Sequence, residues 1–348
     1  MHGLELFRRL RLVSLVATIV LSVKRREKQR LANENRPSRD RGSMQLKADE
    51  HRGKPVHSAP PIGRLYDVEG RHLALHHSGT GGPAVVFAAG AGCMGLDYLN
   101  IHDQVSQFTT SVLYDRAGTG WSDQVELPRS ATQVVDELRS LLHAAGVPAP
   151  YLLVGHSLGG IYTRLYAQRF PDEIAGLLFL EPAHEDFPAI MPKQTPLAKL
   201  RQVFALVGVL LHLKRFYRGL FERMFAEWPD AIRQPLIECH LRLWRVGLRE
   251  VKNQSELYDE VRRGGDMPDV PLLVLTAMGI DQFQIAFMPE SYVREMNDGK
   301  LVLYKALAES VPRGENRVLE NAGHVTIHTD RPDAVVQAIR DLLDKVYM

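Results

Sequence analysis

Short apolar runs alternate with helical segments along most of the chain. The clearest runs are Val85–Ala89, Tyr151–Val154, Gly176–Leu180, Pro271–Ala277 and the shorter Arg317–Leu319. Continuous apolar runs of this length are typical of parallel strands that are buried on both faces. The pattern therefore predicts an α/β protein with a mostly parallel central sheet and helices on both faces of that sheet.

Capping and turn signals predict where several elements begin and end. Ser130, with a glutamine three residues later, and Gly146 at the far end frame one amphipathic helix. Asp330 before Pro332 predicts the start of the last helix. A glycine-rich turn at 79–83 separates an opening hairpin, which begins near residue 64, from the first buried strand.

The strand pattern stops after Glu181, where the sequence becomes helical, aromatic and basic. We expect residues 182–264 to form a helical lid inserted after the sixth strand, between two parts of a catalytic core at 63–181 and 265–348. An uncharged run at Val203–Leu211 has basic flanks and allows two interpretations. It forms a lid helix that lines an acyl pocket or touches a membrane surface, or it packs on the core with its basic ends in water.

Residues 1–62 differ in composition from the rest of the chain. The first sixty contain fourteen Lys and Arg against six Asp and Glu, whereas the remainder carries a net charge of −6 and has no character of a nucleic-acid binder. Leu12–Val23 is apolar but shorter than the ~20 residues that span a bilayer. Two interpretations of residues 8–26 stay open: contact with an anionic membrane surface, or a segment upstream of a true start at Met44. Residues 24–62 have the composition of a flexible linker.

A nucleophile elbow is predicted at Gly155–Gly160, which follows the apolar run at Tyr151–Val154 and precedes a helical segment that Pro171 ends. In this G-x-S-x-G pattern the glycines leave room for a serine on a strained turn between strand and helix, so that its hydroxyl stands clear of the sheet. Ser157 is therefore the candidate nucleophile. The N–H of Leu158 falls at the helix N-terminus, where it can stabilise an oxyanion.

An acid and a histidine are expected downstream of the serine. His324 lies on the loop after the run at Arg317–Leu319, where it can take the Ser157 proton and return it to a leaving group. Asp281, in the loop after the strand at Pro271–Ala277, is the preferred acid. Glu181, at the end of the strand before the lid, is its rival, since both positions can reach the same histidine.

Two further segments give the chain a resemblance to lid-containing bacterial serine hydrolases of the α/β-hydrolase fold. Val85–Gly92 matches the strand and oxyanion loop of that family, and Tyr114–Asp123 matches its D-x-R-x-G-x-G-x-S turn. The resemblance, which begins near Gly63, implies an α/β-hydrolase fold with Ala91 as the second oxyanion donor. In relatives a His-Gly pair is common where this chain has Ala89-Gly90.

Within the matched turn, Asp115 and Arg116 are expected to be structural, because a buried turn with paired charges explains them. Relatives with epoxide hydrolase or haloalkane dehalogenase activity carry an aspartate at the elbow. The serine at this position implies acyl chemistry through an acyl-enzyme.

The sequence therefore predicts a serine hydrolase that cleaves an ester, thioester or related acyl bond of a small molecule, using Ser157, Asp281 and His324. The alternatives are a catalytically silent member of the fold that binds a ligand or partner, and a perhydrolase or carbon–carbon bond hydrolase with the same serine. We expect no metal and no cofactor: His324 and His328 have an i, i+4 spacing, but the residues between them favour extended chain.

The sequence gives less information on cellular location and oligomeric state. The chain is expected to be cytoplasmic or membrane-associated, and its oligomeric state is open. Cys93 and Cys239 are its only two cysteines and predict no disulfide framework.

Overall fold

The computed structural model describes residues 59–192, 217–286 and 288–347. The predicted N-terminal arm, including residues 8–26, and the run at Val203–Leu211 lie outside the described residues, so the interpretations of these segments stay predictions. Among the described residues, no helix is both long and apolar enough to cross a bilayer.

Eight strands form one sheet in the order β1-β2-β4-β3-β5-β6-β7-β8. The strands are β1 Arg64–Val68, β2 Arg71–Ser78, β3 Ala84–Ala88, β4 Ser111–Tyr114, β5 Tyr151–His156, β6 Ile174–Leu180, β7 Leu272–Ala277 and β8 Gly314–Leu319. β1 pairs antiparallel with β2, and β2 pairs antiparallel with β4. All pairs from β4 to β8 are parallel.

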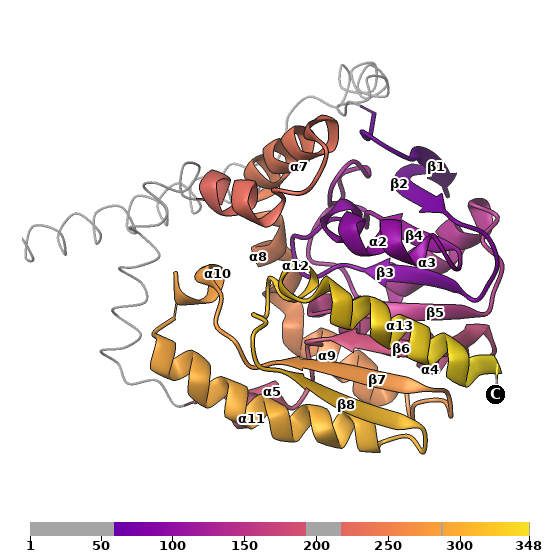
Figure 1. Ribbon diagram of the computed structural model, residues 1–348. Helices are drawn as coiled ribbons and strands as arrows, with labels where there is room; N and C mark the ends of the chain where they lie inside the picture. Colours follow the sequence, from indigo (N-terminus) through magenta and orange to yellow (C-terminus); the bar gives the residue numbers. More distant parts are fainter. Residues whose placement is uncertain (1–58, 193–216, 287, 348) are drawn as a thin grey trace, which may run out of the picture. The chain divides into compact units, whose positions relative to one another are not determined.

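The helices connect these strands and cover the sheet (Figure 1). They are η1 Gly95–Tyr98, α2 Leu99–Val105, α3 Ala131–Ala144, α4 Leu158–Arg169, η2 Pro171–Glu173, α5 Phe187–Ile190, α7 Asp230–Leu243, α8 Val246–Glu250, η3 Val251–Asn253, α9 Gln254–Arg263, α10 Gln282–Ile285, α11 Glu290–Glu309, α12 Ile327–Asp330 and α13 Pro332–Tyr347.

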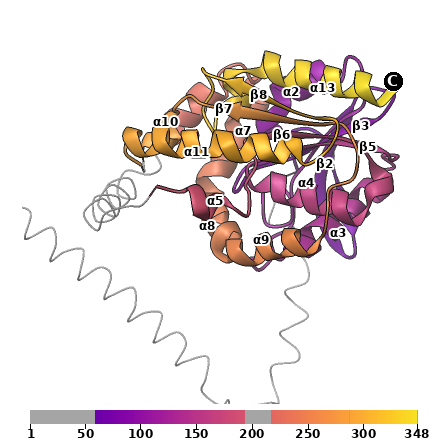
Figure 2. The same cartoon turned by 90° about the horizontal axis from the view of Figure 1, so that it is seen from below.

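Every residue of β3, β4, β5, β6 and β7 is buried, because helices pack on both faces of the sheet. Figure 2 shows α2 and α13 on one side, and α3, α4 and α9 on the other. Successive side chains of a strand point to opposite faces, so Leu153 of β5 joins one core and Leu152 joins the other. The mostly parallel sheet with helices on both faces, predicted from the apolar runs, is confirmed.

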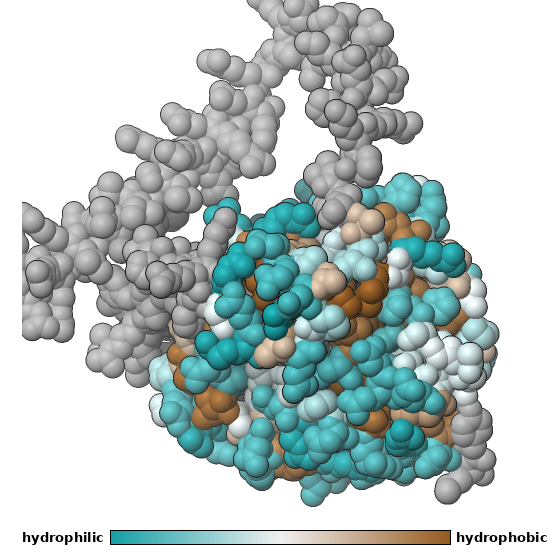
Figure 3. Space-filling view, turned by 45° about the horizontal axis from the view of Figure 1, so that its top comes forward, coloured by the Kyte–Doolittle hydropathy of each residue, from teal (hydrophilic) through white to brown (hydrophobic). Residues whose placement is uncertain are grey.

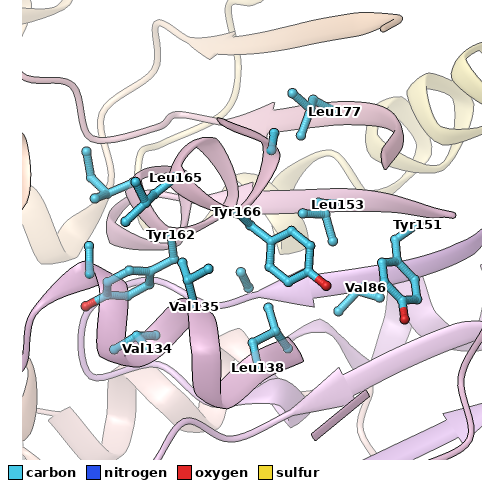
Figure 4. Close-up of a cluster of buried hydrophobic side chains, with 14 of the residues drawn as sticks. Val86, Val134, Val135, Leu138, Tyr151, Leu153, Tyr162, Leu165, Tyr166 and Leu177 are labelled. Atoms are coloured by element: carbon cyan, nitrogen blue, oxygen red, sulfur yellow. The ribbon is translucent and has the colours of Figure 1, made fainter. Parts of the chain in front are cut away.

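The core between the sheet and α3 and α4 is shown in Figure 4. Leu153 lies there between Val86 and Leu177 of the neighbouring strands, beside the ring of Tyr166 of α4, and is fully buried. Truncating a leucine in such a place to alanine costs about 2–5 kcal/mol, because it removes apolar contacts and leaves a cavity. On the face shown in Figure 3, hydrophilic residues predominate and hydrophobic residues form patches between them.

The predicted helix ends are found in part. Ser130 caps α3: its side chain accepts the N–H of Gln133, and the Gln133 side chain accepts the N–H of Ser130. Asp330 instead ends α12. Its carboxylate accepts the N–H of Gly323 and the hydroxyl of Thr326, so it holds the loop before the last helix.

The segment predicted as a lid follows β6, and its described parts fall into two groups. Residues 217–243 pack on the loops after β3 and β4: Trp228 donates to the carbonyl of Leu96, and His240 pairs with Asp97 at 2.8 Å. By contrast α9 packs on α3 and α4, and Glu260 accepts the N–H groups of the first turn of α3. This second group covers the outside of the core, and the role of residues 182–264 as a lid stays a prediction.

Candidate active site

The turn between β5 and α4 positions Ser157. The serine has φ +50° and ψ −119°, and its N–H donates to the carbonyl of Leu180 on the neighbouring strand. A Cβ at Gly159 would lie 1.9 Å from the carbonyl oxygen of Ala88, and one at Gly155 would lie 2.4 Å from the hydroxyl oxygen of Thr163. The turn is therefore packed against β3 and the first turns of α4, and only glycine fits two residues before and two residues after the serine.

His324 contacts both the serine and an acid. Its Nε2 lies 3.1 Å from Ser157 Oγ, and its Nδ1 lies 3.2 Å from Glu181 Oε2. A carboxylate can only accept, so Nδ1 carries the proton and Nε2 is left to accept the serine hydroxyl. Glu181 is fully buried, whereas the His324 side chain is 29% exposed and can be reached by a substrate.

The preferred sequence prediction required Asp281 to contact the histidine ring. The structure does not show that contact. One Asp281 oxygen accepts the N–H of Gln284 as the N-cap of α10, and the other accepts the N–H of Val325 at 2.8 Å. Both oxygens are therefore committed to backbone, one of them to the residue that follows His324. Glu181 is the carboxylate at Nδ1, and Asp281 holds the loop that carries the histidine.

Glu181 is held ionised by its surroundings. Its Oε1 accepts the N–H of Ala277 at 2.6 Å, and its Oε2 accepts from Lys300 Nζ at 2.6 Å. Burial alone would raise the pKa of Glu181, but the Lys300 charge and the hydrogen bond from His324 outweigh it and lower this pKa below its usual value.

A second histidine fixes the backbone of the first. His156 Nε2 lies 2.8 Å from the carbonyl oxygen of His324, and its Nδ1 lies 2.6 Å from the hydroxyl of Tyr98. Since a carbonyl only accepts, Nε2 carries the proton and Nδ1 accepts from the tyrosine. Burial lowers the pKa of His156 well below its usual value, which keeps the ring neutral and this pattern intact.

The loop after β3 passes directly beside the serine. A Cβ at Gly90 would lie 3.3 Å from Ser157 Cβ, so the next peptide, that of Ala91, is close to the nucleophile. Leu158 begins α4, and the N–H groups of a first helical turn have no acceptor within the helix. Of the two predicted oxyanion donors, Leu158 directly follows Ser157 and Ala91 directly follows Gly90 in the adjacent loop, and their role stays a prediction.

A buried ion pair between Arg116 and Glu250 contacts the backbone of this loop. Arg116 donates to the carbonyls of Ala89 and Gly90 at 2.7 and 2.8 Å, and it pairs with Glu250 at 2.9 Å. The second oxygen of Glu250 accepts the N–H of Gly92 at 2.7 Å. Glu250 ends α8, so the insert contributes a residue that holds the oxyanion loop.

A family model described as "Alpha/beta hydrolase family" matches residues 85–338. The chain belongs to the alpha/beta hydrolase family. The match includes the elbow, both carboxylates and the histidine loop.

Curated relatives of this α/β-hydrolase include two uncharacterized proteins of Bacillus subtilis. YqjL is 42% identical over 128 residues, which are 35% of this chain and 49% of the relative. YbdG is 29% identical over 180 residues, which are 50% of this chain and 53% of the relative. The alignments span about half the length of these relatives.

Solved structures show the same fold at low sequence identity. Cfl2 from Burkholderia cenocepacia is 18% identical with a TM-score of 0.60, over 83% of this chain and 99% of that one. A thermophilic esterase from Thermogutta terrifontis is 19% identical with a TM-score of 0.51, over 82% and 98%. An enol-lactonase from Burkholderia xenovorans LB400 is 18% identical with a TM-score of 0.53, over 80% and 99%.

A cavity of about 420 Å³ lies beside the histidine loop of this α/β-hydrolase. It is bounded by residues 220–228, by the loop at 280–283 and by Thr326, Thr329 and Asp330. Its volume is that of a small-molecule site, and its walls mix apolar with charged side chains. No group of three or more His, Cys, Asp or Glu in the described part of the chain could hold a metal ion.

Three contributors to the site were not found from the sequence. Lys300 lies on α11 and Glu250 on α8, and neither belongs to a local motif that marks it. His156 is the first variable residue of the G-x-S-x-G pattern, so its position was visible but its contact with His324 was not.

Cys93 lies beside the oxyanion loop, where burial raises the pKa of its thiol and disfavours the reactive thiolate.

Proposed function

We propose that this α/β-hydrolase is a serine hydrolase that cleaves an ester, thioester or related acyl bond of a small molecule. Ser157 is the nucleophile, His324 the general base and then the general acid, and Glu181 the acid that orients the imidazole. The observation that carries the proposal is that His324 joins Ser157 Oγ and Glu181 Oε2 through its two ring nitrogens.

The chemistry follows from these contacts. Ser157 Oγ attacks the acyl carbon while its proton passes to Nε2, and the resulting imidazolium is stabilised by the buried carboxylate at Nδ1. The N–H groups of Leu158 and Ala91 receive the oxyanion, where one such donor contributes about 3 kcal/mol to transition-state stabilisation. His324 then protonates the leaving group, and water resolves the acyl-enzyme.

The cavity beside the histidine loop is our candidate for one part of the substrate. Leu220, Met224 and Phe283 give it apolar walls that suit an acyl chain or the alcohol portion of an ester. We therefore expect hydrolysis of p-nitrophenyl esters, with a chain-length preference that a series of increasing acyl length measures.

A fluorophosphonate probe tests the nucleophile without knowledge of the substrate. We expect the probe to label wild-type protein on the peptide that contains Ser157, and Ser157→Ala to abolish labelling and lower ester turnover by ~10⁶-fold, by analogy with triad dissection in another hydrolase. Ser106→Ala, at the end of α2 and away from the site, serves as the matched control and should label like wild type.

Each result separates one alternative. A folded wild-type protein that never reacts with the probe would favour a catalytically silent ligand-binding member of the fold. Labelling at Ser157 without hydrolysis of any ester in the series would direct attention to perhydrolase or carbon–carbon bond hydrolase substrates.

A further inference from the structure

Lys300 is the residue of this site with the most unusual surroundings. It lies on α11 with its side chain only 3% exposed, and Nζ donates to Glu181 Oε2 and to the carbonyl of Ala277, both at 2.6 Å. An ammonium group is rarely buried without a partner, because removing it from water is costly. In this site its partner is the same carboxylate oxygen that accepts from His324.

Two cations therefore compete for one carboxylate whenever His324 is protonated. Lys300 is the only ammonium or guanidinium group of the described residues that contacts Glu181. The other titratable groups around the pair are His156 from β5, Tyr304 from α11, Asp281 from the loop after β7, and His328 and Asp330 from α12. Asp281 accepts two backbone N–H groups, and Asp330 accepts one backbone N–H and the hydroxyl of Thr326. The two histidines are buried with lowered pKa values, so Lys300 is the dominant charge.

We propose that Lys300 is a positioning residue that keeps Glu181 ionised and sets the pH above which the Glu181–His324 pair can accept the serine proton. This inference rests on the proposed function. The active pair has an ionised Glu181 and a neutral His324, and one further proton inactivates it. Lys300 opposes that proton whether it resides on the histidine or on the carboxylate, so the direction of the effect does not depend on which group carries it.

Removing the charge should therefore shift the pH dependence of Ser157 reactivity upward. In the labelling reaction the Oγ–P bond forms as the P–F bond breaks, and the serine proton passes to His324. We expect the midpoint of the acidic limb of the labelling rate to rise by about one pH unit or more in Lys300→Met and in Lys300→Gln, from the strength of charge interactions at this distance. Lys300→Gln retains an N–H donor for Glu181, so it separates the charge from the hydrogen bond.

Two further variants complete the test. Lys300→Arg keeps the positive charge and should return the midpoint toward that of wild type. Tyr304→Phe, one turn along α11, removes a buried hydrogen bond to the carbonyl of Pro182 without changing any charge. It should lower stability and leave the midpoint in place.

The results distinguish this inference from the proposed function. Wild-type protein that is not labelled at Ser157 would contradict the proposed function. Labelling of wild type with an unchanged midpoint in the neutral Lys300 variants would overturn the role of Lys300 and leave the serine hydrolase standing. Failure of both neutral variants to fold while Tyr304→Phe folds would also overturn it, because a requirement for folding alone explains that result.

Discussion

Two carboxylates near His324 make different contacts although each follows one of two neighbouring strands. Glu181 has φ +51°, a left-handed conformation that turns its side chain at the end of β6 toward the ring. Asp281 lies four residues beyond β7, with φ −97° and ψ 163°, and caps α10. The difference lies in how the backbone leaves each strand, so one carboxylate contacts the imidazole and the other contacts the loop that carries it.

The first prediction compares the two carboxylates directly. Glu181→Gln should lower kcat by ~10⁴-fold with little change in KM, as an Asp-to-Asn change does in another triad, because the amide no longer selects the tautomer or stabilises the imidazolium. Asp281→Asn should lower kcat by less than about tenfold and cost about 1 kcal/mol of stability, since it weakens one backbone hydrogen bond. Steady-state kinetics on a p-nitrophenyl ester and urea unfolding give both quantities.

The reverse order of losses would return the role of the acid to Asp281. Because Glu181→Gln also leaves Lys300 without a charged partner, its circular-dichroism spectrum and unfolding midpoint are needed beside the kinetics. A large kcat loss in a variant with a native spectrum is the result we expect.

At the residue scale, local motifs were sufficient to predict that Ser157 and His324 lie together, because each is within a few residues of the turn that positions it. No local motif of this kind identifies which carboxylate contacts the histidine. Asp281 and Glu181 both follow apolar strands, and the sequence contains no information on which backbone turns toward the histidine. Lys300 is 119 positions from its partner Glu181 and was invisible for the same reason.

At the scale of elements, the insert does more than extend over the core. α8 supplies Glu250 to Arg116 and to the N–H of Gly92, which connects the insert to the oxyanion loop. Both side chains of this pair are almost fully buried. Loss of one partner would therefore leave an uncompensated charge and a backbone donor free to shift.

The second prediction concerns this connection. Glu250→Gln should reduce the fluorophosphonate labelling rate by about tenfold or more, because the loop of Ala91 is no longer held; this is less than the ~10²-fold or greater cost of removing an oxyanion donor outright. Its stability should fall by about 3–5 kcal/mol at most. Labelling kinetics on the fraction that remains folded provide the measurement.

Glu137→Gln is the matched control. Glu137 is a buried partner of Arg129 and also accepts a backbone N–H, that of Ala117, so the substitution removes an equivalent set of contacts away from the serine. It should lose stability without a comparable loss of labelling rate. Equal labelling rates in the two folded variants would show that Glu250 serves stability alone.

Element positions were predicted well where one pattern dominates. The buried strands and the capping box of α3 depend on apolar runs and on a pair of residues three apart, both of which are local. The division of the insert into two groups could not be predicted from the sequence, because η3 and α9 have helical patterns like those of the rest of the predicted lid. Their place on the core depends on contacts such as that of Glu260 with the first turn of α3.

At the scale of the whole molecule, four buried histidines make stability depend on pH. Burial is the largest cause that lowers the pKa of each: to about 3 for His102, to about 4 for His184 and His328, and well below its usual value for His156. Below the ordinary histidine pKa of about 6.5 the unfolded chain binds protons that the native protein does not. Stability is therefore lost as the pH falls from about 6.5 toward 4, and these groups contribute no slope above about pH 7.

The third prediction isolates one of these groups. Neither ring nitrogen of His328 has a hydrogen-bond partner among the described residues, and the ring lies 4.8 Å from that of Tyr98 between centroids. We compare the free energy of unfolding of His328→Phe with that of wild type at each pH. The variant's value, relative to wild type, should be about 2 kcal/mol higher at pH 5 than at pH 8, because one proton fewer favours its unfolded state. Urea unfolding at the two pH values measures this, with the exposed His143→Gln as control.

A pH dependence in His328→Phe as steep as that of wild type would contradict the assignment. It would mean that His328 takes up its proton without unfolding, so that the buried position does not keep the ring neutral.

The left-handed backbone at both Ser157 and Glu181 has a consequence for laboratory evolution. Apart from glycines, positive φ occurs at only three of the described residues, and two of them are these. Such conformations cost roughly 1–3 kcal/mol each, and glycine relieves that cost. Glycine at position 181 would leave the buried Lys300 without its charged partner, which costs more than the relieved strain. A library screened for heat resistance without an activity check should therefore enrich glycine at position 157 and not at 181, and its most robust survivors should be inert proteins that have kept the fold.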